Sequence, residues 1–120
     1  MNLNNRVQLI GTLGSNPVIK EFESGSKVAR FSVFTVDVVK KDDEFLKETL
    51  WHTVVAWDKL ADQAVKHLIK GGEVVVDGKL ARRSYIDTTG QNQFITEVIA
   101  YTIIAGAQPQ NIEMRNIKRA

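Results

Sequence analysis

Apolar and polar residues alternate along most of the chain, and this pattern predicts β-strands, since successive side chains of a strand point to opposite faces. The clearest alternation lies in five segments, residues 6–14, 28–39, 49–57, 73–86 and 94–104. They are rich in β-branched and aromatic residues, which favour strands. A shorter segment, residues 19–22, is predicted to form a hairpin with the second strand, and the charged residues 40–48 are predicted to form an exposed hairpin loop.

The period changes at residues 58–72, where apolar residues recur at helical spacing. The residues expected on the buried face of this helix are Leu60, Ala61, Ala64, Val65, Leu68 and Ile69. Asp58 is a suitable N-cap, because a carboxylate accepts a hydrogen bond from a free backbone N–H of the first turn. Gly71 and Gly72 are predicted to end the helix.

Five strands with one helix between the third and the fourth predict an all-β fold, the five-stranded OB-fold barrel. A barrel is favoured because the edge strands of a sheet must be paired or covered, and the helix would plug one end. A two-layer α+β sheet with the helix on one face is the alternative topology. We expect one OB-fold domain over residues 1–106, followed by a short, basic and flexible tail over residues 107–120.

Each strand of a small barrel has one face toward the interior and one toward the outside. In the fourth strand, small and apolar residues are predicted to face inward, namely Val74, Val76, Gly78 and Leu80. In the third strand, Val54 and Ala56 suit the interior. The side chains predicted to face outward from the third strand are those of Trp51, Thr53, Val55 and Trp57.

An outward pair of tryptophans has two interpretations. Aromatic residues are enriched at protein contacts, so a subunit interface or rim packing is one of them. The other is a surface for single-stranded nucleic acid, because bases stack on aromatic rings while cations contact phosphates. The cations expected around the same surface favour this second interpretation. They are Lys20, Arg30, Lys40, Lys41, Lys59, Lys79, Arg82 and Arg83.

The composition narrows the function classes. The 120 residues are 43% hydrophobic and 25% charged, with a net charge of +2 and no cysteine, which fits one globular domain in a reducing cytoplasm. The first residues hold no long apolar run, so we expect neither a signal peptide nor a membrane span. No serine lies near a histidine and an aspartate in the sequence, and the consecutive acids at 42–44 diverge in a loop. We therefore expect no catalysis, no metal and no cofactor.

Four stretches, in this order and spacing, resemble the bacterial single-stranded DNA-binding protein family over roughly residues 3–105. NRVQLIGTLGSNPV at residues 5–18 is similar to the opening strand and turn of that family. ETLWHTVVAWDKLA at residues 48–61 resembles its third strand and the start of its helix. HLIKGGEVVVDGKLARRSYID at residues 67–87 and GQNQFITEV at residues 90–98 resemble its fourth strand, long loop and fifth strand.

The resemblance implies an OB-fold homo-oligomer, usually a tetramer, that coats single-stranded DNA without sequence preference in replication, recombination and repair. The stacking aromatic residues of the family would fall on Trp51, Trp57 and Tyr85. Phe94 is interpreted either as a further ring facing the DNA or as a hydrophobic anchor of its hairpin. Another stacking position of the family falls on Val39, whose aliphatic side chain cannot stack.

Other family positions carry charge or lie between subunits. Phosphate contacts would fall on Arg6, Lys20, Lys59, Lys70 and Arg83. Lys79 is added to this set because it shares the outward face of the fourth strand. His52 falls on a position at a subunit interface.

The C-terminal end departs from the family pattern. Family members usually carry a Gly/Pro/Gln-rich segment with an acidic tip that recruits replication and repair proteins, whereas residues 114–120 here include three basic residues and no acid. Either the sequence is trimmed or this is a tailless relative, and we hypothesise that the basic end adds phosphate contacts. The alternative function is an oligomeric, primosome-type adaptor whose aromatic face binds a protein partner. For either function we expect a cytoplasmic, nucleoid-associated protein.

Overall fold

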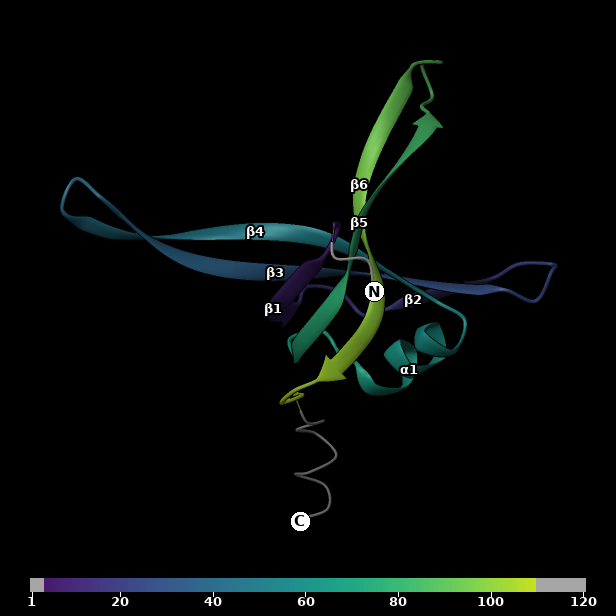
Figure 1. The fold of residues 1–120 in the computed structure, drawn as a ribbon, viewed down its shortest axis with the longest axis horizontal. Helices are drawn as coiled ribbons and strands as arrows, with labels where there is room; N and C mark the ends of the chain where they lie inside the picture. The colour runs from purple at the N-terminus through teal and green to yellow at the C-terminus, as the bar shows by residue number, and fades with distance from the viewer. Residues whose placement is uncertain (1–3, 110–120) are drawn as a thin grey trace, which may run out of the picture.

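The computed structural model describes residues 4–109, which form six strands and one helix (Figure 1). The elements are β1 (Val7–Leu13), β2 (Val18–Glu21), β3 (Lys27–Lys41), β4 (Glu44–Trp57), α1 (Lys59–His67), β5 (Glu73–Ile86) and β6 (Asn92–Ala105). The predicted tail lies mostly outside this range, since residues 110–120 are not described. Within residues 4–109, no helix has the length and apolar character needed to cross a membrane.

The strands form one closed barrel. Their order is β1-β5-β6-β4-β3-β2, and β1 also pairs with β3, through Leu13 opposite Val33, which closes the ring. β4 and β6 pair in parallel, and the other pairs are antiparallel. The short β2 lies outside the ring along β3. The predicted OB-fold is thereby confirmed, with the helix between the third and fourth barrel strands, and the two-layer alternative is wrong.

The barrel interior is filled by apolar side chains from all five barrel strands. Leu13, Phe31, Val33 and Val54 are among its buried members. Val74, Val76 and Gly78 are buried, as predicted. Leu80 is 49% exposed, so its predicted inward position is wrong. The pairing of β1 with β5 ends at Gly78, and Leu80 therefore lies where β5 leaves the barrel.

The helix covers one end of the barrel, where Ala61, Ala64 and Leu68 join the core. It is shorter than predicted and ends at His67, because Leu68 adopts an extended conformation that places its side chain in the core. Val65 and Ile69 were predicted to lie on the buried face of this helix, but both are exposed.

Asp58 precedes the helix, as predicted, but its side chain does not cap the first turn. Its carboxylate Oδ1 accepts a hydrogen bond from the backbone N–H of Lys27 at 3.1 Å, and its own N–H donates to the Lys27 carbonyl at 2.9 Å. Asp58 therefore ties the β4–α1 junction to the start of β3. The prediction of a capping side chain is wrong, because the Asp58 carboxylate bonds the backbone of Lys27 at the start of β3 and not the first turn of the helix.

Two long hairpins project from the barrel (Figure 1). The first is formed by the outer halves of β3 and β4, which pair up to Lys41 opposite Glu44. Residues 40–48 were expected to form a loop, yet only Asp42 and Asp43 turn the chain, both at positive φ. Aspartate tolerates that conformation, and two such residues suit a two-residue hairpin turn. We name this hairpin, residues 35–50, the β3–β4 arm; the second hairpin is the outer part of β5 and β6.

Candidate nucleic-acid interface

The wall formed by β2, β3 and β4 carries the two tryptophans on its outer face. The strand register places Trp57 opposite Val28 and Trp51 opposite Phe34 on this face. The indoles are 62% exposed at Trp51 and 42% exposed at Trp57, as the strand alternation predicts. Val55 lies between them but is buried, which corrects its predicted exposure. Val55 pairs with Arg30 on β3 and with Ile99 on β6, so a neighbouring strand covers it on each side.

Each tryptophan is held against a phenylalanine that the sequence did not single out. Trp57 stacks on Phe22, with ring centroids 6.1 Å apart and planes at 21°. Trp51 packs against Phe34, with centroids 5.1 Å apart. A signal for Phe34 exists in the sequence, because a two-residue turn at 42–43 pairs it with Trp51. We call the four rings of Phe22, Phe34, Trp51 and Trp57 the aromatic face.

Glycine also shapes this face. A Cβ atom built on Gly14 would clash with the six-membered ring of Trp51 and would lie 2.9 Å from the Ser32 hydroxyl. The missing side chain lets the indole lie directly over the end of β1. The chain therefore approaches the indole closely at Gly14, and this contact fixes one side of the Trp51 ring.

Beside the aromatic face, one buried carboxylate joins two arginines. Glu97 on β6 is only 6% exposed. Its Oε1 accepts a hydrogen bond from Nε of Arg83 at 3.0 Å, and its Oε2 accepts one from Nε of Arg30 at 3.4 Å. The arginine side chains remain 45% and 40% exposed. A guanidinium has five N–H donors, so a bond through Nε leaves further donors for a phosphate.

Glu97 is a functional candidate that the sequence reasoning missed. Its only signal is an acid that interrupts the alternating apolar positions Ile95 and Ile99. The contact with Arg30 spans 67 residues of chain, so no local pattern indicates it. The pairing fixes Arg30 and Arg83 near each other and connects β3 with the β5–β6 hairpin.

The other cations predicted to contact phosphates lie at different places on the barrel. Lys20 lies over the ring of Phe22, with Nζ 5.1 Å from its centroid, next to Trp57. Lys79 is half-buried on the side of β5 that also carries Arg83. Arg6 bonds the Asp77 carboxylate through Nε at 3.3 Å and Nη2 at 3.1 Å, so its charge already has a counterion.

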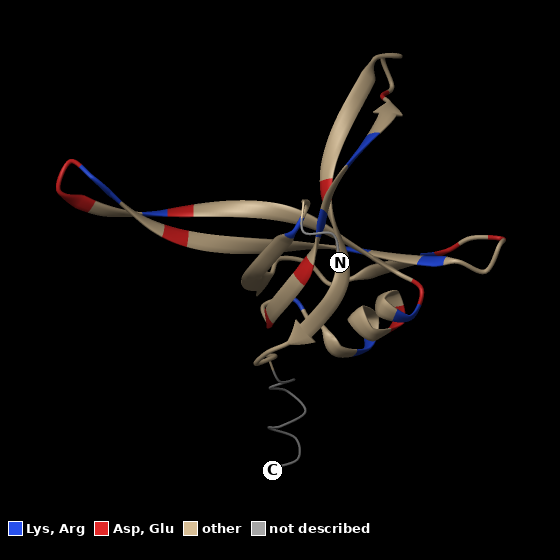
Figure 2. Ribbon diagram, viewed as in Figure 1, with Lys and Arg blue, Asp and Glu red and all other residues tan. Residues whose placement is uncertain are grey.

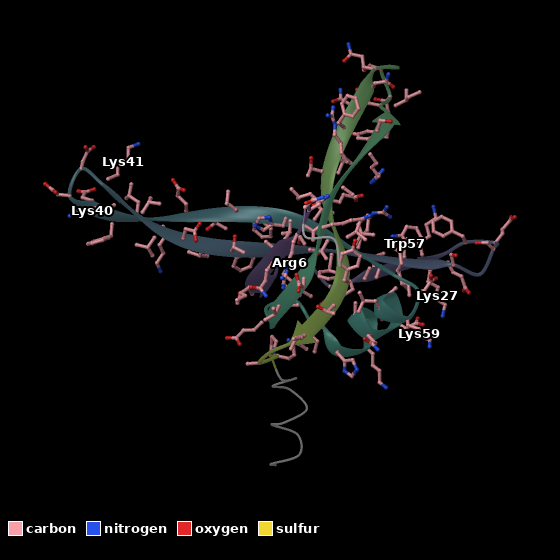
Figure 3. The ribbon with its side chains drawn as sticks, in the orientation of Figure 1. Arg6, Lys27, Lys40, Lys41, Trp57 and Lys59 are labelled. Atoms are coloured by element: carbon pink, nitrogen blue, oxygen red, sulfur yellow. The ribbon has the colours of Figure 1, made fainter. Side chains whose placement is uncertain are left out.

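Lys59 and Lys70 lie at opposite ends of the helical connection. Lys59 is exposed at the start of α1, and Figure 3 shows it at the same end of the molecule as Trp57 and Lys27. Lys70 follows the helix, and its backbone N–H donates to Asn16 Oδ1 at 2.7 Å, near the end of β1. The structure therefore brings Lys20 next to a tryptophan, but distributes the remaining lysines around the barrel.

The β5–β6 hairpin separates the two rings that the sequence placed together. Tyr85 pairs with Gln93, whereas Phe94 pairs with Ser84, so the two rings lie on opposite faces. Tyr85 shares its face with Arg83 and Glu97. Phe94 is instead covered by the Arg82 guanidinium, whose Cζ is 3.8 Å from the ring centroid. Tyr85 therefore lies on the same side of the sheet as the aromatic face, whereas Phe94 lies on the other side.

His52 is half-buried, and its Nε2 lies 3.0 Å from the Thr35 hydroxyl. Val39, which the resemblance predicts to occupy a stacking position, lies on the face of the β3–β4 arm opposite to Trp51. Among residues 4–109, no group of three histidines or acids is placed to hold a metal ion.

Asp87 organises the tip of the β5–β6 hairpin, two residues beyond Tyr85. Its Oδ1 accepts hydrogen bonds from the Thr89 hydroxyl at 2.6 Å and from the N–H groups of Thr89 and Gln91, and its Oδ2 accepts one from the Gln93 amide. The Thr89 hydroxyl, followed by Gln91 and Gln93, lowers the pKa of Asp87 from 3.8 to about 2. Bonds of this kind favour the ionised form.

We expect the hairpin tip to keep its order at pH values well below those at which an aspartate usually titrates. Because the folded pKa is lowered, the contribution of Asp87 is complete above pH 3.8 and is lost as the pH falls through about 2. The amide proton shifts of Thr89 and Gln91, followed by NMR, should titrate with a midpoint near 2. Asp87→Asn should abolish this titration. A midpoint near 4 in the unmodified protein would contradict the assigned hydrogen bonds.

The fold and the face together define a class: an OB-fold barrel with exposed, supported aromatic rings beside clustered arginines. Comparison with known proteins identifies the family within this class. Residues 4–105 match the model of the single-strand binding protein family, and the chain belongs to that family. The match covers nearly the same residues as the resemblance found in the sequence, which is thereby confirmed.

Two curated relatives carry the name single-stranded DNA-binding protein. Single-stranded DNA-binding protein 1 of Chlorobaculum tepidum is 41% identical over 97 residues, which cover 79% of this chain and 60% of that protein. The relative from Bacteroides thetaiotaomicron is 37% identical over 97 residues, covering 78% of this chain and 60% of that protein. The matched region thus spans about 60% of the length of these relatives.

A solved structure gives the same fold. The single-strand binding protein of Plasmodium falciparum in complex with single-stranded DNA superposes with a TM-score of 0.78 at 34% sequence identity. The superposition covers 88% of this chain and 97% of that one.

Proposed function

We propose that this protein binds single-stranded DNA without sequence preference, and coats and protects it during replication, recombination and repair. One observation carries the proposal: two exposed indoles, each supported by a phenylalanine, lie on the same barrel wall as Arg30, which Glu97 links to Arg83 on the β5–β6 hairpin. The family match and the DNA-bound structure of the Plasmodium falciparum relative support it.

The proposed mechanism is stacking combined with charge. Bases stack on Trp51, Trp57 and Tyr85, because every base has a π-face, and this contact tolerates any sequence. The stacking contribution known for proteins of this class is about 1–3 kcal/mol per base. Arg83, with Arg30 beside it, contacts the phosphates, and Lys20 and Lys79 flank the rings. Arg6, Lys59 and Lys70 are proposed as peripheral phosphate contacts, and Phe94 as a ring for DNA that reaches the far face of its hairpin.

The proposal extends to assembly and location. The active form is a homo-oligomer, a tetramer, with His52 at a subunit interface, so that one DNA strand wraps over several barrels. The protein acts without catalysis, metal or cofactor, in the cytoplasm on the nucleoid. Replication and repair proteins are proposed as partners, as in the family, although residues 114–120 contain no acidic residue like those of the docking tip of the family.

Adding oligo-dT at low salt should quench the tryptophan fluorescence, because bases that cover exposed indoles change their surroundings. The same amount of the matching duplex should quench far less, since paired bases cannot reach the rings. Circular dichroism on the same sample checks that the protein is folded. A folded protein whose emission does not change with excess oligo-dT would refute the proposed function. It would also favour the adaptor hypothesis, in which the aromatic face serves a protein partner.

A further inference from the structure

The last part of β6 has an edge that no other strand covers. β4 pairs with β6 only through Val54 opposite Val98 and Val55 opposite Ile99, so within residues 4–109 this side of β6 has no strand partner after Ile99. On its other side β6 stays paired with β5 up to Ala105. We call the uncovered side of residues 100–105 the open edge. Proteins usually protect such an edge, because it presents unpaired backbone groups to another segment.

The hydrogen bonds at the end of β6 show which residues face the open edge. The N–H of Gly106 donates to the Glu73 carbonyl at 3.0 Å, on the β5 side. Backbone groups of an antiparallel strand alternate between its two sides, so those of Ile104 also face β5. The N–H and C=O groups of Ile103 and Ala105 therefore point toward the open edge, where they can pair with an extended segment.

Helix α1 forms the other wall of a groove along this edge, which we call the α1–β6 groove. The groove has a volume of about 310 Å³ and is lined by Gln63, His67, Leu68, Ile103, Ile104 and Ala105. Residues 98–105 contain no charged side chain, and Figure 2 shows this end of β6 without charge beside α1. A strand edge that faces a helix across an apolar groove fits an extended peptide, which adds to the sheet as a strand and buries alternate side chains.

The last described residues lead the chain to this end of the barrel. Gln108 Oε1 accepts a hydrogen bond from the backbone N–H of Ile69 at 3.1 Å, and its Nε2 donates to the Glu73 carbonyl at 2.7 Å. A Cβ atom built on Gly71 would lie 3.4 Å from Cγ of Pro109, so the proline ring lies against Gly71. The chain therefore leaves the described region beside the connection between α1 and β5.

The residues after Pro109 have the reach and the pattern of a strand for this groove. Leu68, in the groove wall, lies three residues before Gly71, and Ile112 lies three residues after Pro109; each interval spans at most about 11 Å. Ile112 and Met114 are separated by one residue, so an extended conformation places both apolar side chains on the same side.

We propose that residues 111–115 add to the open edge of β6 as an antiparallel strand, with the side chains of Ile112 and Met114 in the α1–β6 groove. The backbone groups of Ile103 and Ala105 are the hydrogen-bond partners of this segment. The inference goes beyond the proposed function, because it concerns a contact within the chain and its test contains no DNA.

Amide hydrogen exchange of the full chain, followed by NMR, tests the added strand. In the unmodified protein the amides of Ile103 and Ala105 should exchange at least about tenfold more slowly than in an Ile112→Asp, Met114→Asp double variant, because two carboxylates cannot enter an apolar groove. The amide of Ile104 faces β5 and should exchange equally in both proteins, which provides an internal control.

Glu113→Gln is the matched control for the double variant. In an extended segment residue 113 points away from the groove, so this change should keep the protection of Ile103 and Ala105. Equal exchange of these two amides in the unmodified protein and in the double variant would show that no strand covers the open edge, and the inference would be wrong.

Disulfide trapping locates Met114 independently. The chain has no cysteine, so an introduced pair gives one assignable bond. Gln63 is exposed and lines the groove, whereas Lys66 is exposed on the same helix and does not line it. With diamide as oxidant, Gln63→Cys with Met114→Cys should form an intramolecular disulfide at least about tenfold faster than Lys66→Cys with Met114→Cys, because a disulfide needs close Cβ atoms. Mass spectrometry of the digested protein measures both rates.

Two results of the trapping experiment would overturn the inference. Equal rates for the two cysteine pairs would mean that residue 114 has no fixed place at the groove. Disulfides that join only different chains would assign the groove to the same segment of a second copy. Neither result affects the quenching of the tryptophans by oligo-dT, which tests the proposed function on a different surface.

Discussion

Replacing both Trp51 and Trp57 with alanine is expected to weaken binding of single-stranded DNA by roughly 1.5 to 4 orders of magnitude. Two stacked bases at about 1–3 kcal/mol each correspond to roughly 2–6 kcal/mol of lost binding free energy. The arginines remain, so a weak, strongly salt-dependent affinity should persist. Anisotropy of labelled oligo-dT is the suitable measurement, because these variants have no tryptophan fluorescence.

The conservative pair Trp51→Phe and Trp57→Phe is the matched control. It keeps a flat ring at both positions and should retain most of the affinity, whereas loss of packing alone would damage both pairs of variants. Each indole rests on a phenylalanine, so sedimentation and circular dichroism must accompany the binding curves. If the alanine variant binds DNA normally but loses its oligomeric state or a protein partner, the aromatic face serves protein contacts and the adaptor hypothesis stands.

Phe31→Ala is expected to have the largest effect on stability, lowering the free energy of unfolding by about 3–5 kcal/mol. Phe31 is buried in the barrel among the side chains that all five strands contribute, so its loss leaves a cavity that the closed ring cannot fill. Urea denaturation followed by circular dichroism measures the change.

Phe45→Ala removes the same ring from an exposed site and should alter stability by no more than about 0.5 kcal/mol. The two phenylalanines thus test whether burial, and not the ring itself, determines the contribution to stability. Equal stability of the two variants would mean that Phe31 is not packed as the structure has it.

Much of the architecture follows from the residues alone. Alternation located the barrel strands, and the change of period located the helix, because these signals depend on neighbours within a few residues. The outward position of Trp51 and Trp57 followed from the same alternation. Even the Trp51–Phe34 pair was accessible in principle, since a two-residue turn at Asp42 and Asp43 fixes the register of the whole hairpin.

The remaining features depend on contacts between distant segments. The sequence gives no indication that Asp58 binds the start of β3 instead of capping the helix. It does not show that β1 ends its pairing before Leu80, which leaves that residue exposed. Residues 40–48 look like a loop because they are charged, yet a charged hairpin can be a regular ribbon when both of its faces are in solvent.

Glu97 has a consequence for how the protein meets its ligand. Two long arginine side chains would lose rotational freedom on contact with a phosphate, at a cost of about 0.5–1.5 kcal/mol each. Here a carboxylate beneath them restricts both before any ligand arrives. The free protein therefore already holds its guanidinium groups in place, and this entropic cost belongs to folding rather than to association.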